Sequence, residues 1–163
     1  MSRDHVLSIL VENKPGVLSR VTGLISRRGF NINSLAVAPT EDSTMSRMTV
    51  TVNCDDVALA QLTKQLHKLI SVYKIFDLTG GACITRELIL VRVAVTPEKR
   101  GEVIEIANVF RAKVVDVGKT SITIEATGDN EKLNGMVNLL RAYGVREIIR
   151  TGRIAMQRSS NDA

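Results

Sequence analysis

One order of predicted elements occurs twice in this chain, at an interval of about 80 residues, and it restricts the possible folds more than any other feature. In each copy an apolar run is followed by an amphipathic stretch, two strand-like runs, a second amphipathic stretch and a last strand-like run. This βαββαβ order is typical of the split βαβ arrangement, in which helices cover one face of an antiparallel sheet. We therefore predict an α+β fold with two ferredoxin-like domains in tandem, at 1–78 and 86–152, joined by a linker at 79–85 and followed by a flexible tail at 153–163.

Hydrophobic periodicity defines the elements of both units. The run 46–52 alternates apolar and polar residues, as a strand with one buried face does, whereas 17–28 has the spacing of an amphipathic helix and ends before Gly29. The expected strands are 6–11, 31–38, 46–52, 72–78, 88–95, 113–117, 121–126 and 145–150. The expected helices are 17–28, one capped by Asp55 or Asp56, one capped by Thr96 with Pro97 in its first turn, and one capped by Asp129.

The turn between the first strand and the first helix has the sequence NKPGVLSR, from Asn13 to Arg20. Pro15 suits a first helical turn, because its missing N–H would be unpaired there, and Gly16 leaves the backbone amides accessible. A helix N-terminus attracts negative charge, and apolar residues follow at once, so a small ligand with a carboxylate and an aliphatic tail, such as an amino acid, would fit. From these residues alone, a turn that only joins the strand to the helix is the simpler interpretation.

A net charge of +5 raises the question of nucleic-acid binding. The basic excess is shared by the two halves of the chain and forms no continuous block. Proteins that read single strands also need aromatic platforms, and this chain has no Trp, two Tyr and three Phe. A basic nucleic-acid-binding module therefore stays a minor alternative.

Residues suited to catalysis or metal binding are few. The two histidines, His5 and His67, have no neighbouring cysteine, serine or paired carboxylates in a catalytic pattern, so we expect surface positions for both, no catalytic residues and no metal site. Cys54 and Cys83 lack CxxC spacing and are expected to be unpaired in a reducing compartment. Because no apolar run is long enough to span a membrane and no secretory signal is seen at the start, we expect a cytoplasmic protein.

Each unit has about 70 residues, a size at which a single core is marginal and oligomerisation often adds the missing burial. We therefore expect a homodimer. Joining open sheet edges across a two-fold axis would bury them.

Residues 4–152 closely resemble the small, regulatory subunit of acetolactate synthase. The segments that carry this resemblance are LSILVENKPGVLSRVTGLISRRGFNINSLAVAPTEDSTMSRMTV, QLTKQLHKLISVYKIFDLT, ELILVRV and VFRAKVVDVG. The first unit resembles an ACT domain, a ferredoxin-like module that binds effector amino acids at the turn after its first strand, usually across a dimer interface. The resemblance implies a non-catalytic subunit that binds and activates the large catalytic subunit and confers feedback inhibition by L-valine in branched-chain (valine, isoleucine, leucine) biosynthesis. It also implies that thiamine diphosphate, FAD and Mg belong to that partner and that this chain carries no cofactor.

The resemblance also implies an effector site, and we call its members the predicted effector residues. They are Asn13, Gly16, Val17, Ser19, Asn31, Ile32 and Ala38. The second unit departs from the pattern, because 96–101 replaces the Asn-x-x-Gly arrangement and brings a carboxylate near the helix start, so no second valine site is expected there. A free-standing ACT-type amino-acid sensor that acts on another partner stays an alternative function.

Overall fold

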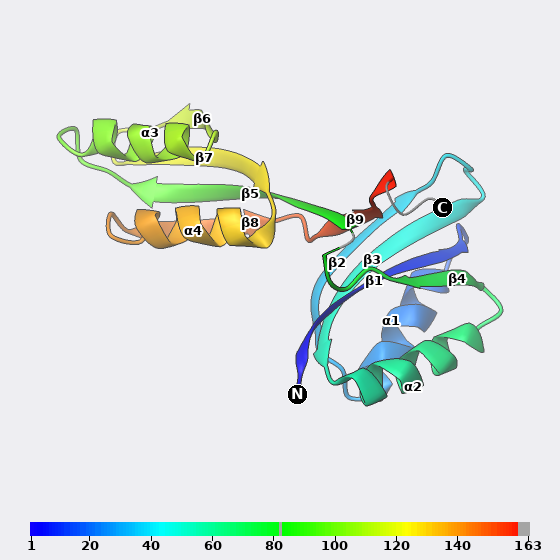
Figure 1. Cartoon of the computed structure of the whole chain (residues 1–163). Helices are drawn as coiled ribbons and strands as arrows, with labels where there is room; N and C mark the ends of the chain where they lie inside the picture. The colour runs from blue at the N-terminus through cyan, green and yellow to red at the C-terminus, as the bar shows by residue number, and fades with distance from the viewer. Residues whose placement is uncertain (82, 160–163) are drawn as a thin grey trace. The chain divides into compact units, whose positions relative to one another are not determined.

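Two units divide the chain in the computed structural model, which describes residues 1–81 and 83–159 (Figure 1). Unit 1 comprises Met1–Ile84 together with the residues from Arg153 onward, and unit 2 comprises Thr85–Gly152. Each unit has an antiparallel sheet and two helices in the order βαββαβ, so the predicted α+β fold is confirmed.

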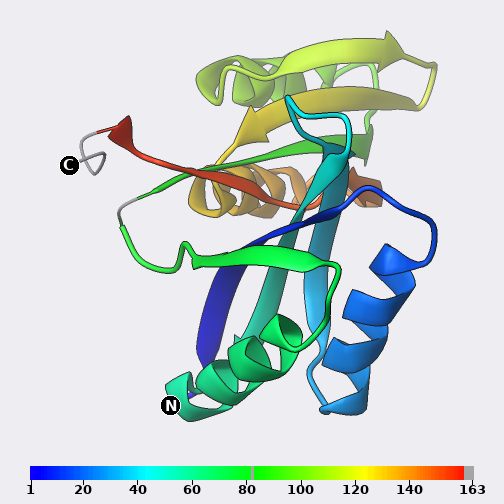
Figure 2. The same ribbon diagram turned by 90° about the vertical axis from the view of Figure 1, so that its right-hand side faces the viewer.

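Unit 1 is a four-stranded sheet with the strand order β2-β3-β1-β4. Its elements are β1 (Arg3–Glu12), α1 (Val17–Arg27), β2 (Ile32–Pro39), β3 (Met45–Cys54), α2 (Asp56–His67) and β4 (Val72–Asp77). Helices α1 and α2 contact each other and lie on one face of the sheet, as the two views show (Figures 1 and 2). Strand β2 lies at an edge of this sheet, with β3 as its only neighbour among the described strands.

The core of unit 1 lies between the sheet and its helices and follows the two periodicities of the sequence. Every second residue of β1 and β3 points to the helices. Helix residues three or four positions apart pack against them. These buried residues are Leu7, Ile9 and Val11 of β1, Met48, Val50 and Val52 of β3, Val17, Val21 and Ile25 of α1, and Leu59, Leu62 and Leu66 of α2.

Unit 2 repeats this plan with the strand order β6-β7-β5-β8. Its elements are β5 (Cys83–Ala94), which begins in unit 1, α3 (Arg100–Val109), β6 (Lys113–Val117), β7 (Ser121–Gly128), α4 (Asn130–Leu140) and β8 (Val145–Arg150). Its core is separate from that of unit 1 and joins alternate residues of β5 and β7 to the buried faces of α3 and α4. Asp129 caps α4 as predicted, because its side chain accepts a hydrogen bond from the Lys132 N–H at 2.9 Å.

Helix α3 begins later than predicted, at Arg100, with Lys99 as its N-cap residue. The backbone N–H groups of Lys99 and Arg100 both donate to the Thr96 carbonyl oxygen, so Thr96 opens a separate turn and does not cap the helix. Backbone and Thr96 hydrogen bonds lower the pKa of Glu98 in this turn. The predicted cap by Thr96 is therefore wrong. Thr96 accepts these N–H groups through its backbone carbonyl oxygen in a turn that precedes the helix, and Lys99 is the N-cap residue.

The prediction of a surface position is wrong for His5, whose side chain is fully buried, and right for His67, which is exposed. His5 lies on the helix-covered face of β1, the same face as Leu7, because side chains two residues apart share a face. Its Nδ1 is 3.3 Å from Thr79 Oγ1, and its Nε2 is 3.2 Å from the Cys54 carbonyl oxygen. These contacts join the start of β1 to two segments far away in the sequence, which no local pattern reveals.

The end of the chain also differs from the prediction of a flexible tail. Residues Ile154–Gln157 form strand β9, which pairs with β5. Arg153, just before it, lies 3.8 Å from the Asp4 carboxylate and donates its N–H to Ser34 Oγ at 3.5 Å. The part of the predicted tail at 160–163 lies outside the described residues. The linker between the units is also shorter than the predicted 79–85, because β5 begins at Cys83.

Cys54 and Cys83 are both free thiols, as expected. Within the described residues, no helix combines the length and the apolar character needed to cross a membrane. The described residues also contain no group of three or more His, Cys, Asp and Glu side chains arranged to hold a metal ion.

Candidate functional site

The turn between β1 and α1 depends on Gly16. This residue is the N-cap of α1 with φ 84° and ψ −11°, a left-handed conformation that glycine adopts without the strain a side chain brings. It provides no side chain to cap the helix, so the first amides of α1 have no capping partner from it. The Arg20 N–H donates to the Gly16 carbonyl oxygen at 3.1 Å, which closes the first helical turn. The turn therefore presents backbone donors and the positive end of the helix dipole.

Asn13 fastens this turn to the hairpin between β2 and β3. Its backbone N–H donates to the Thr44 carbonyl oxygen at 2.8 Å, and its side-chain Nδ2 donates to the Ser43 carbonyl oxygen at 2.9 Å. The side chain itself is exposed. Asn13 thus has a structural role that fixes the position of the turn, and its amide is held at the rim of the turn.

Val17 and Ser19 begin α1 in different environments. The Val17 side chain is 3% exposed and packs in the core, and its backbone N–H donates to the Lys14 carbonyl oxygen at 3.4 Å. Ser19 is exposed on the outer side of the first helical turn. Of these two predicted residues, only Ser19 presents its side chain to solvent beside the turn.

Asn31 and Ile32 lie at the opposite end of α1 from Gly16. They follow the C-terminus of the helix, whose 11 residues span about 16 Å. Asn31 is exposed and donates from Nδ2 to Asn33 Oδ1 at 3.2 Å, while Ile32 starts β2 and packs partly on the core. Within a single chain, Asn31 and Ile32 therefore lie away from the turn.

Ala38 lies at the other end of β2, on the same side of the unit as the turn. It pairs with Arg47 of β3, close to the hairpin that Asn13 contacts, and it is exposed. The predicted effector residues thus form two groups in one chain. One group is Asn13, Gly16, Val17, Ser19 and Ala38, and the other is Asn31 and Ile32.

Arg20 is a residue of this site that the prediction left out. Its guanidinium reaches back over the turn, with Nη2 3.6 Å from the position of a Cβ built on Gly16. Its Nη1 donates to Ser71 Oγ at 3.4 Å, which steers the side chain toward the turn. The signal was present in the sequence, because residues four apart on a helix share a face. Arg20 adds a cation at the place where a carboxylate would meet the helix N-terminus.

Unit 2 has the same turn framework without the glycine turn. The Val95 N–H donates to the Thr120 carbonyl oxygen at 3.0 Å, as Asn13 does to Thr44 in unit 1. The Ala94 N–H donates to the Gly144 carbonyl oxygen at 2.8 Å. The two strand-to-helix turns therefore occupy equivalent positions in their units but carry different side chains.

Comparisons with known proteins cover both units. A family model described as "AHAS small subunit-like ACT domain" matches residues 7–74, and one described as "Small subunit of acetolactate synthase" matches residues 86–159. A probable acetolactate synthase small subunit from Archaeoglobus fulgidus is 51% identical over 156 residues, which is 96% of this chain and 98% of that protein. The acetolactate synthase small subunit from Mycolicibacterium smegmatis is 53% identical over 94% of this chain and 91% of its own length. The chain belongs to the acetolactate synthase small subunit family.

A solved structure of the same family agrees with this assignment. The crystal structure of the acetolactate synthase small subunit from Thermotoga maritima matches with a TM-score of 0.86 and 39% identity, over 96% of this chain and 98% of that chain. The predicted family and the ACT domain of unit 1 are thereby confirmed, as is the expectation of a non-catalytic, regulatory subunit. The second family model extends through β9, so the strand at the end of the chain belongs to the region that the family shares.

Proposed function

We propose that this acetolactate synthase small subunit binds L-valine at the turn between β1 and α1, and that it activates the large catalytic subunit and makes it sensitive to valine. The name of the relatives, small subunit, implies a large partner, and we extend this to the chain. In this proposal thiamine diphosphate, FAD and magnesium belong to the large subunit, and the function is exerted in the cytoplasm.

The observation that carries the proposal is the left-handed Gly16 at the start of α1, with Arg20 over it. Backbone donors, a helix N-terminus and a guanidinium meet at one exposed turn, and together they suit the carboxylate of an amino acid. The exposed Leu18 on the first turn of α1 offers apolar surface close by. Asn13 joins this turn to the β2–β3 hairpin, so a ligand that moves the turn would also move the hairpin at the edge of the sheet.

We further propose that the complete pocket needs two chains. Asn31 and Ile32 are far from the turn in one chain, but β2 is an edge strand, and edge strands can pair with a second copy. The strand from Ile32 to Ala38 is about 20 Å long. In an antiparallel pair of two β2 strands, the Ile32 end of one strand lies beside the Ala38 end of the other. It would bring Asn31 and Ile32 of one chain beside the turn of the other, and it would cover Leu18 and Val37, which are 45% and 41% exposed.

A complementation experiment tests both parts of this proposal. The Gly16→Asp and Asn31→Ala variants are each expected to bind valine poorly as homodimers. In a mixed dimer, one of the two pockets would contain both substitutions and the other would contain neither. Calorimetry on the purified mixed dimer should therefore recover near-normal affinity, with one valine per two chains.

The alternatives give different results in the same experiment. If each pocket were built by one chain, both pockets of the mixed dimer would be damaged and no binding would return. If the mixed dimer bound valine but did not change the activity of the large subunit, the free-standing sensor would be the better description.

A further inference from the structure

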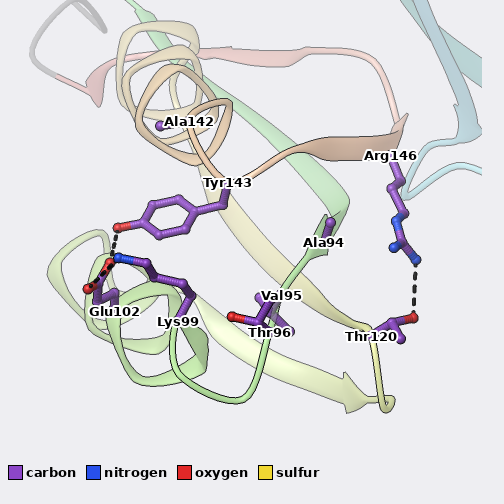
Figure 3. Close-up of a pocket in the computed structure, with 9 residues that line it drawn as sticks. All are labelled: Ala94, Val95, Thr96, Lys99, Glu102, Thr120, Ala142, Tyr143 and Arg146. Carbon is purple, nitrogen blue, oxygen red and sulfur yellow. Dashed lines mark hydrogen bonds and ion pairs between the residues drawn. The ribbon is translucent and has the colours of Figure 1, made fainter.

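A cavity of about 630 Å³ opens in unit 2, where β5 leads into α3 (Figure 3). Its size is within the usual range for pockets that hold small molecules. Ala94, Val95 and Ala142 supply apolar surface, and the turns before α3, before β7 and after α4 enclose it. The cavity lies at the position in unit 2 that is equivalent to the Gly16 turn in unit 1, because the Val95–Thr120 backbone bond corresponds to the Asn13–Thr44 bond.

One wall of this cavity is a closed polar cluster. The Tyr143 hydroxyl donates to Glu102 Oε2 at 2.8 Å, and Lys99 Nζ lies 3.3 Å from Glu102 Oε1 (Figure 3). These two partners lower the pKa of Glu102, so the carboxylate is ionised at neutral pH. Both oxygens of Glu102 already have donors, and its charge is offset by Lys99. This wall therefore offers little to a ligand ammonium group.

Arg146 forms the opposite wall, at the start of β8. Its Nη1 donates to Thr120 Oγ1 at 3.4 Å, a long bond to a neutral group (Figure 3). The carboxylate of the next residue, Glu147, forms an ion pair with Arg92 at 2.8 Å. In the described part of the chain, Arg146 has no ion-pair partner, so most of its five N–H donors remain for a ligand. A guanidinium in this state favours a carboxylate, which it can bind through two parallel hydrogen bonds.

We infer that the unit 2 cavity binds a small aliphatic carboxylate, anchored by Arg146 and Thr120 with its chain against Ala94, Val95 and Ala142. An amino acid and a 2-oxo acid share this carboxylate chemistry. Because Glu102 is already paired, the ammonium of an amino acid gains nothing here, and a 2-oxo acid binds at least as well. The inference does not depend on valine binding in unit 1.

Backbone amide NMR on the full chain tests the inference, because it reports each unit separately. Leucine and its 2-oxo acid, 4-methyl-2-oxopentanoate, are titrated in parallel to about 10 mM, which reaches weak millimolar binding. The amides of Thr120 and Gly144 should shift with both probes, and the 2-oxo acid should bind at least as tightly. Shifts that stay within unit 1, or no shifts at all, would overturn the inference.

Two variants show whether Arg146 is the anchor. Arg146→Gln should weaken binding at the unit 2 amides about tenfold or more, because a hydrogen-bonded charge is lost. Arg141→Gln removes the same charge from an exposed position that does not line the cavity, so it should leave the affinity unchanged. Equal affinity in both variants, or equal loss, would refute Arg146 as the anchor. The unit 2 amide spectrum of each variant without ligand checks that the substituted unit is folded, since unit 2 has its own core.

Discussion

The substitution Gly16→Asp tests the proposed effector turn most directly, because its effects on folding and on binding are expected to differ. A side chain at φ 84° costs about 1 to 2 kcal/mol, with aspartate at the low end because it tolerates the left-handed region. A carboxylate at a helix N-terminus returns about 0.3 to 1 kcal/mol. The free energy of unfolding should therefore change by no more than about 1 kcal/mol, and the variant should stay folded.

Valine binding should change far more. The Cβ of a side chain on residue 16 would lie 3.6 Å from Arg20 Nη2, so an aspartate carboxylate there would compete for the cation that we assign to the ligand. Two like charges about 4 Å apart repel by about 4 kcal/mol at an effective dielectric constant near 20, and pairing with Arg20 reduces this to about 2 to 4 kcal/mol. The dissociation constant of valine should rise roughly 30-fold to 1000-fold.

Three measurements separate the possible outcomes. Calorimetry gives the valine affinity, chemical unfolding gives the stability, and an activity assay of the complex with the large subunit gives activation and valine inhibition. Gly16→Ala carries the strain without the charge and should lose less than about tenfold in affinity. Gly80→Asp is the matched control, because Gly80 is exposed, has φ 81° and lies outside the turn.

We expect the Gly16→Asp subunit to activate the large subunit still, while valine no longer inhibits the complex. An effector acts only through its different affinities for two states. A folded Gly16→Asp subunit that kept full valine sensitivity would refute the reasoning. The effector site would then lie elsewhere, and the assignment of Asn13, Gly16 and Asn31 would be lost with it.

Two further predictions concern unit 2. Asp129→Ala removes the side chain that caps α4 and should lower the free energy of unfolding by about 1 kcal/mol, measured by urea unfolding. Tyr143→Phe removes the donor that most lowers the Glu102 pKa, so that pKa should rise toward its usual value in an NMR titration. Because the folded pKa is depressed, the stabilisation from this bond is present above the unfolded pKa of Glu102 and is lost as the pH falls through the folded pKa. The stability difference from wild type should therefore shrink in acid, and a difference that grew in acid would contradict this sign.

The sequence by itself determined the βαββαβ order of both units, the Asp129 cap of α4 and the two cores. Alternation in 46–52 and the helical spacing in 17–28 are local patterns, and Asp129 caps α4 through an amide three residues away. Such features follow from neighbours along the chain, so periodicity and capping rules are enough to predict them. The family resemblance similarly identified the seven predicted effector residues, whose binding role stays a prediction.

Tertiary structure alone decided where those residues lie relative to one another. Asn31 is 18 residues after Asn13 in the sequence, yet α1 carries it to the opposite end of the helix from the turn. His5 is buried because Cys54 and Thr79 meet it from distant segments, and Ile154–Gln157 is a strand because β5 supplies a partner. Pairings between distant segments form only when the whole chain has folded, and local sequence patterns carry no record of them.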